Sequence, residues 1–179
     1  TPSTLAIAEH YSISGKSFIE AIIVGYEVAI RAINTVSGPG SGTGLGGTYG
    51  VAAAASKVMH FTEPQIVQAI GLSSIHAPVT EPVTIWEDGY MGKESIGWGG
   101  VSGIESAILI NKGFTGPKKV LDKYYGTSWE TIGSKFEILK GYFKRYPSCR
   151  WTHTALDLTL EMMKTHSLTG QDIKGVTVA

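Results

Sequence analysis

Lys93 is the first candidate for a catalytic or binding residue, and it lies in a glycine-rich segment over residues 91–103. Apolar side chains recur at helical spacing after this segment, so a helix is expected there. A lysine placed just before such an apolar helix would be partly desolvated, which makes its ammonium a stronger acid and suits it to binding an anion or transferring a proton. The alternative is that Lys93 is a solvated residue in the first turn of the helix.

A second group of polar side chains lies near the end of the chain. Lys144, Arg145, Arg150 and His153 place three cations and one imidazole within ten residues, at a turn between an expected strand and an expected helix. Together with Lys93 these cations could bind a di- or tricarboxylate, and lysine and histidine are both able to donate or accept protons in catalysis. The alternative is a basic turn followed by a solvated helix start.

The third candidate is a glycine-rich loop over residues 37–47. It contains Gly42-x-Gly44-x-x-Gly47, which matches the dinucleotide-binding fingerprint in form. That fingerprint needs a preceding strand, and a long helix is expected here instead, so dinucleotide binding is rejected. The loop would offer backbone N–H groups and the positive end of a helix dipole to an anion. The alternative is a flexible surface loop.

Composition narrows the classes of function. Of the 179 residues 42% are hydrophobic and only 17% are charged, and the net charge is zero, so the basic footprint of a nucleic-acid-binding protein is absent. The low charge predicts a buried subunit interface or a missing partner segment.

The sequence contains no apolar run of about 20 residues, so a transmembrane helix is not expected. The first residues also lack the basic start and apolar core of a signal peptide.

The single cysteine, Cys149, cannot form an internal disulfide and indicates a reducing compartment, which we take to be the cytoplasm. One cysteine and five scattered histidines do not make a structural zinc site, so we expect no metal. A thiol nucleophile at Cys149, close in sequence to His153, is the less favoured alternative.

Helices are expected to position these candidates. Hydrophobic residues recur at helical spacing over most of the first 134 residues. One of these helices begins with a predicted capping box between Thr62 and Gln65. The expected helices cover residues 2–12, 17–36, 48–60, 62–75, 91–112, 117–124 and 128–133.

The pattern changes in the last part of the chain. Residues 136–139 and 142–146 look extended, residues 152–165 form an amphipathic helix, and residues 173–178 alternate like a strand. A strand without a partner belongs to an unfinished sheet.

These patterns predict two domains. Residues 1–134 form an α-helical domain, and residues 135–179 begin an α+β domain whose sheet is incomplete. The predicted fold class is therefore mainly α.

Together these pieces resemble the MmgE/PrpD family, whose members include 2-methylcitrate dehydratase, cis-aconitate decarboxylase and an iminodisuccinate epimerase. The resemblance runs in order along essentially the whole chain. It rests on the order and spacing of several motifs rather than on any single one. The matching segments are Gly25-Tyr26-Glu27-Val28, Thr43-Gly44 and residues 50–57, 69–72, 91–103, 113–117 and 143–153.

The resemblance implies a helical domain and a smaller α+β lid with the substrate between them, usually in a homodimer that needs no metal or organic cofactor. It implies a lyase or isomerase that dehydrates, decarboxylates or epimerises a small polycarboxylate. Lys93 and Lys144 match family lysines that bind carboxylates or transfer protons. Arg150 and His153 match the family's Arg-x-x-His pattern, whose role is less defined.

Two departures from the family bear on activity. A histidine commonly precedes the Thr-Gly pair of the glycine loop, and Ser41 holds that place here, ahead of Thr43 and Gly44. A serine cannot act as a general acid at neutral pH, although this loop is still expected to approach the anion. The chain also corresponds to the central part of longer members, without N-terminal helices that carry an Asp and a His of the site. The alternative to an enzyme is therefore a non-catalytic helical fragment that only self-associates.

Overall fold

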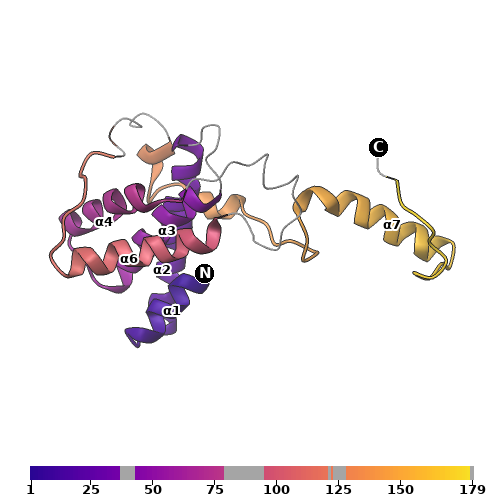
Figure 1. Ribbon diagram of the computed structural model, residues 1–179, viewed down its shortest axis with the longest axis horizontal. Coiled ribbons are helices and arrows are strands. Elements are labelled where there is room, and N and C mark those ends of the chain that lie inside the picture. The colour runs from indigo at the N-terminus through magenta and orange to yellow at the C-terminus, as the bar shows by residue number, and fades with distance from the viewer. Residues whose placement is uncertain (37–42, 79–94, 121, 123–127, 178–179) are drawn as a thin grey trace. The chain divides into compact units, whose positions relative to one another are not determined.

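The computed structural model describes residues 1–36, 43–78, 95–120, 122 and 128–177, and within these ranges the regular structure is helical, without a β-strand (Figure 1). The mainly α fold class is thus confirmed. None of the described helices is both long and apolar enough to cross a membrane. The elements are helices α1 (Pro2–His10), α2 (Gly15–Val36), α3 (Thr43–Val58), α4 (Glu63–His76), α6 (Ile96–Asn111) and α7 (His153–Thr165), and the 3-10 turns η2 (Ser128–Thr131), η3 (Glu137–Lys140) and η4 (Arg150–Thr152).

Contacts divide the chain into two compact units, Thr1–Lys140 and Gly141–Ala179. The first unit holds helices α1, α2, α3, α4 and α6 with η2 and η3, and the second holds η4 and α7. The sequence pattern changes earlier, after residue 134. The identity of the second unit as the start of an α+β domain stays a prediction.

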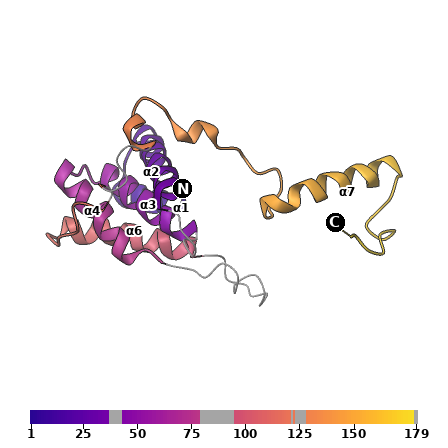
Figure 2. The ribbon, with the colours of Figure 1, turned by 90° about the horizontal axis from the view of Figure 1, so that it is seen from above.

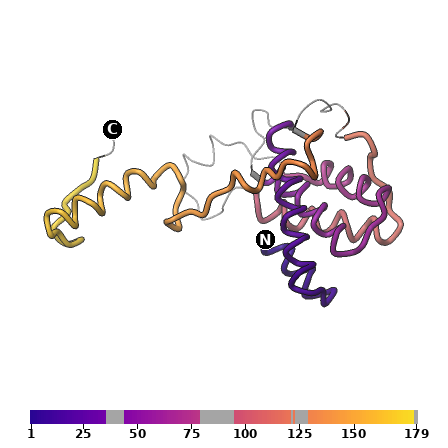
Figure 3. The backbone as a smooth tube through the Cα atoms, turned by 180° about the vertical axis from the view of Figure 1, so that it is seen from behind, coloured from indigo at the N-terminus to yellow at the C-terminus, as the bar shows by residue number. Residues whose placement is uncertain are grey.

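Helix α3 is the centre of the first unit. Its four consecutive alanines, Ala52 to Ala55, are each at most 3% exposed, so neighbouring elements cover this helix all round. Helices α2, α4 and α6 all pack against it, as Figure 2 shows. Helix α1 contacts α2, α3 and α6 and leads directly into α2, which the tube in Figure 3 makes clear.

Glycines let α6 approach α3 closely. A Cβ atom on Gly99 would lie 2.5 Å from the carbonyl oxygen of Gly44, and one on Gly103 would lie 2.7 Å from the carbonyl oxygen of Thr48. Both distances are too short for a real side chain. Gly99 faces Gly44 and Gly103 faces Thr48, so the contacts move toward the C-terminus of both helices together. Helices α3 and α6 therefore run in the same direction. At these two glycines the backbone of α3 therefore lies directly against α6.

Helix α3 begins earlier than the sequence predicts. Residues 43–47 were expected to belong to a loop, but they form the first turns of α3, which starts at Thr43. Glycine disfavours a helix by roughly 1 kcal/mol relative to alanine. Packing of these turns against α2 and α6 overrides that preference. Residues 37–42, the rest of the predicted loop, lie outside the described residues.

The predicted capping box is confirmed, and a glycine ends α6. Before α4, the backbone N–H of Thr62 donates to Oε1 of Gln65 at 2.9 Å, as part of the predicted capping box. After α6, Gly113 has a φ of +88°, a left-handed conformation that glycine adopts without strain and that ends a helix.

A buried ion pair attaches the two 3-10 turns η2 and η3 to α2. Glu27 and Arg31 are 5% and 0% exposed, and Nη2 of Arg31 lies 3.0 Å from Oε2 of Glu27. Arg31 also donates to Oγ1 of Thr131 at 3.1 Å and to the carbonyl oxygen of Lys135 at 2.6 Å. The backbone N–H of Ile138 donates to Oε1 of Glu27 at 2.8 Å. The pair therefore holds a segment that is about 100 residues away in sequence.

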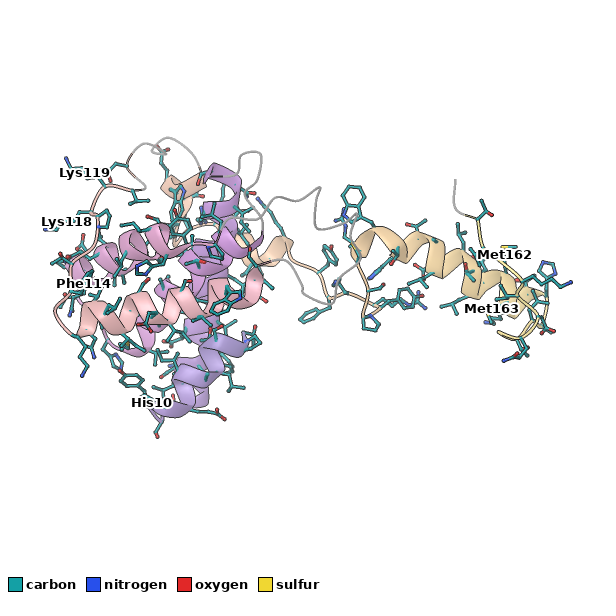
Figure 4. All side chains as sticks on the ribbon, in the orientation of Figure 1. His10, Phe114, Lys118, Lys119, Met162 and Met163 are labelled. Carbon is teal, nitrogen blue, oxygen red and sulfur yellow. The ribbon has the colours of Figure 1, made fainter. Side chains whose placement is uncertain are left out.

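The second unit contains the predicted amphipathic helix, which is α7. None of its residues is buried, and Met162, labelled in Figure 4, is 60% exposed.

Three predictions of extended structure are wrong for the described residues. Residues 137–140 form η3, because the Ile138 N–H is engaged by Glu27 rather than by a strand. Residues 142–146 and 173–177 are irregular. A strand needs a partner to receive its backbone hydrogen bonds, and the described part of the chain offers none.

The short helices predicted over residues 117–124 and 128–133 are found only in part. Residues 128–131 form η2, and residues 117–119 are irregular. Residues 121 and 123–127 lie outside the described residues.

Candidate functional site

Several predicted site residues fall outside the described residues. Lys93 and Ser41 lie in the omitted ranges 79–94 and 37–42. Thr43 is described as the first residue of α3, but its side chain is not. The roles of these three residues stay predictions.

Gly44 lies where the first turns of α3 and α6 meet. It is buried, and a side chain on it would collide with the hydroxyl and carbonyl groups of Ser95, the residue before α6. The hydroxyl of Thr48, which is fully buried, donates to the carbonyl oxygen of Gly44 at 2.7 Å. The N-termini of two parallel helices therefore lie side by side, and the positive ends of both dipoles favour negative charge near them.

A cavity of about 530 Å³ lies beside these turns, among α1, α2, α3 and α6. Its walls include Ile22, Tyr26, Ile33 and Ile96, and among the described residues no charged side chain lines it. Gly44, the predicted site residue described nearby, is not part of its walls. The described walls are mostly apolar and also include Thr1, Ser3 and Thr4.

Lys144 and Arg150 are exposed side chains of the second unit. The Lys144 ammonium donates to the carbonyl oxygen of Ser148 at 2.7 Å, which closes the turn before η4. The Arg150 guanidinium lies over the ring of Tyr142, 5.6 Å from its centre. Both cations are accessible to an anion in solution.

His153 is the first residue of α7 and is half-buried. Its ring stands at 82° to the ring of Tyr146, with the ring centres 5.2 Å apart. Its Nε2 atom is buried and has no hydrogen-bond partner within the described part of the chain. Buried polar atoms in proteins usually have a partner, so this nitrogen marks His153 as an unusual residue.

Tyr146 and Asp157 are neighbours of His153 that the sequence analysis missed. The Tyr146 hydroxyl donates to Oδ1 of Asp157 at 2.5 Å, and Nη1 of Arg145 donates to the same oxygen at 3.0 Å. The hydrogen bond to Asp157 raises the pKa of Tyr146, because the phenol must keep its proton to make it. A signal was available, since Asp157 lies four residues after His153 and so shares one face of the predicted helix.

The structure places Lys144, Arg150 and His153 in one compact unit, and Thr43 and Gly44 in the other. No group of three His, Cys, Asp or Glu residues suited to holding a metal ion occurs among the described residues. Cys149 is a free, exposed thiol.

Comparison with protein-family models matches residues 1–138 to the MmgE/PrpD N-terminal domain. The matched region includes helices α1, α2, α3, α4 and α6 and the Glu27–Arg31 pair. A comparison with curated proteins found no match.

Proposed function

Because the chain belongs to the MmgE/PrpD family, we propose that it is part of a lyase or isomerase that acts on a small di- or tricarboxylate by acid–base proton transfer. The proposal covers dehydration, decarboxylation and epimerisation, which share a proton transfer at carbon close to a carboxylate. Such chemistry needs cations that bind the carboxylates and a side chain that accepts or returns the proton. It includes no metal and no organic cofactor.

The group of Lys144, Arg150 and His153 carries this proposal. Lys144 and Arg150 supply exposed positive charge, and the planar guanidinium of arginine matches the geometry of a carboxylate. Histidine is the side chain best suited to transfer protons near neutral pH. Lys144 would bind a carboxylate or take part in the proton transfer, with Arg150 assisting.

Lys93 and the glycine segment, which belong to the first unit, are also proposed to take part in binding the anion. Lys93 precedes Ser95 by two residues in the sequence, and Ser95 packs on Gly44. This packing supports a shared role for the two segments in binding the anion, aided by the N-termini of α3 and α6. Ser41, in place of the family's histidine, would donate a hydrogen bond without acting as a general acid.

Thermal unfolding of the 179-residue chain with citrate or cis-aconitate tests the class of ligand. We expect the midpoint temperature to rise, because a ligand that binds only the native state stabilises it. The gain in the free energy of unfolding is about 2.7 kcal/mol at a ligand concentration 100 times Kd. Lys144→Ala and Arg150→Ala should each reduce the rise. Lys164→Ala is the matched control, since Lys164 is an exposed cation about 16 Å further along α7 from His153. A thermal midpoint that neither citrate nor cis-aconitate changes would contradict the proposal.

Turnover tests the catalytic part. In a complete enzyme that contains this chain, Lys93→Ala and Lys144→Ala are expected to lower turnover of the polycarboxylate strongly. Unchanged turnover of every polycarboxylate tried would show that these lysines have no role in the reaction.

A non-catalytic helical module that only self-associates is the second candidate. The exposed residues Ile19, Tyr26 and Ile33 favour it, because they lie seven residues apart on one face of α2 and are 59%, 44% and 39% exposed. Turnover of cis-aconitate or 2-methylcitrate by the chain itself would exclude this candidate. A dimer that does not respond to either ligand would favour it.

A further inference from the structure

Three side chains of the second unit are linked in a series that ends at His153. His153 and Asp157 are four residues apart on α7, so they lie one turn apart on the same face. Tyr146, from the turn before η4, contacts both of them. Its hydroxyl donates to Asp157 at 2.5 Å, and its ring stands against the imidazole with the ring centres 5.2 Å apart.

The Tyr146 side chain is held at several points. Asp157 holds the hydroxyl, and Arg145 donates to the same carboxylate oxygen at 3.0 Å. The Arg145 guanidinium also lies over the Tyr146 ring, 5.4 Å from its centre. A ring engaged at its hydroxyl, on its face and against the imidazole has little freedom to turn, so it can fix the orientation of its neighbour.

The two nitrogens of the His153 ring also differ in their surroundings. Nε2 is buried without a partner among the described residues, whereas Nδ1 is not among such buried atoms. A buried nitrogen cannot exchange a proton with a bound anion. In this orientation Nδ1 is therefore the nitrogen available for proton transfer.

We propose that Tyr146 is a positioning residue for His153, and that Asp157 holds Tyr146 in place so that Nδ1 of His153 stays available to a polycarboxylate. The role of Nδ1 in a reaction rests on the proposed function. The positioning itself does not, because it follows from contacts within one unit.

NMR spectra of the imidazole groups in the whole chain test the positioning. The His153 signals are assigned with His153→Gln. Tyr146→Leu is expected to shift the His153 ring signals, because the neighbouring aromatic ring current is lost. Tyr146→Phe keeps the ring and loses the hydroxyl, so the shift should be smaller. Tyr142→Phe is the matched control, since the Tyr142 ring lies against Arg150.

A double variant separates a linked series from two independent contacts. Tyr146→Phe and Asp157→Ala remove the same hydrogen bond, so the double variant should shift the His153 signals no further than the larger single variant does. Arg145→Met should shift them less, because Arg145 is 75% exposed and solvent weakens its ion pair.

Two results would overturn the positioning role. One is His153 signals that stay at their wild-type positions in Tyr146→Leu, and the other is additive shifts in the double variant. Tyr146→Phe, which removes a single oxygen atom, keeps the test decisive if circular dichroism shows that Tyr146→Leu unfolds α7.

Turnover distinguishes this proposal from the proposed function. In an active enzyme, Tyr146→Phe and Asp157→Ala should lower kcat by up to about 100-fold with little change in KM, because a displaced proton-transfer group slows the chemical step. Linked NMR shifts without turnover of any polycarboxylate would overturn the proposed function and leave the positioning intact. Turnover together with unresponsive His153 signals would overturn only the positioning.

Discussion

At the scale of single residues, Glu27 and Arg31 are the most deeply buried charged side chains among the residues that the structure describes. Desolvating a charged pair is costly, and the cost is offset only when the remaining hydrogen bonds of both groups are made. Here Arg31 also donates to Thr131 and to the Lys135 carbonyl oxygen, and Glu27 accepts from the Ile138 N–H. Removing one partner leaves the other charge buried without compensation.

We therefore expect Glu27→Ala to lower the free energy of unfolding by roughly 3–5 kcal/mol. The matched control is Glu20→Ala. Glu20 pairs with Lys57 at 3.3 Å on the surface, where both side chains are more than 40% exposed, so the expected loss is below about 1 kcal/mol. Urea unfolding measures both values, and equal losses would contradict the assigned role of the buried pair.

The same carboxylate predicts how stability depends on pH. Burial alone would raise the pKa of Glu27, but the backbone N–H groups of Ile138 and Glu137 and the Arg31 guanidinium lower it below its ordinary value of 4.5. A lowered folded-state pKa contributes stability above the unfolded-state pKa, and this stability is lost as the pH falls through the folded-state pKa. The urea concentration at the unfolding midpoint should therefore decrease as the pH is lowered below 4.5. Glu27→Gln should flatten this profile, and a profile parallel to that of the wild type would refute the assignment.

At the scale of elements, the packing of α6 on α3 depends on missing side chains. Gly99 and Gly103 place the α6 backbone directly against Gly44 and Thr48 of α3. The gain is that two parallel helices start side by side, next to the two segments proposed to bind the anion. The same sequence feature weakens each helix taken alone.

Two alanine substitutions in α6 separate packing from helix propensity. Gly99→Ala should destabilise the protein by roughly 1–3 kcal/mol, because the added methyl forces the helices apart. Gly97→Ala, where no described atom of another element lies within 4 Å of the new methyl, should stabilise it by at most about 1 kcal/mol. Thermal and urea unfolding compare the two, and a Gly99→Ala protein as stable as Gly97→Ala would show that the close packing is absent.

At the scale of the whole molecule, the surface carries little charge and much apolar area. Charged residues make up 17% of the sequence. Helix α2 exposes Ile19, Tyr26 and Ile33 along one face, and α7 buries none of its residues. Apolar stripes of this kind commonly mark surfaces that bind another protein chain.

We expect the chain to self-associate through the exposed face of α2. Size-exclusion chromatography with light scattering should show a dimer that the double substitution Ile19→Lys and Tyr26→Lys converts to a monomer. Leu139→Lys is the control, because Leu139 is 82% exposed and belongs to η3 rather than to α2. A monomeric wild type would contradict the proposed association surface. A dimer that persists with Ile19→Lys and Tyr26→Lys together would contradict it as well.

Much of the fold was predictable from sequence because helix formation is largely local. The capping box at Thr62, the glycine that follows α6 and the amphipathic α7 are all set by residues within a few positions of one another. The family resemblance was also visible, and the match over residues 1–138 confirms it. Lys144, Arg150 and His153 could be picked out by type and spacing, although their roles stay predictions.

Tertiary structure decided the features that depend on contacts between distant residues. It extended α3 back to Thr43 because neighbouring helices stabilise turns that glycine alone would leave open. It placed residues 137–139, part of the segment 136–139 that was expected to be extended, in η3, where Glu27 engages the Ile138 N–H. Sequence determines which local structures and chemical groups are available, whereas the fold decides which of them meet, since burial and pairing arise only when separate segments pack together.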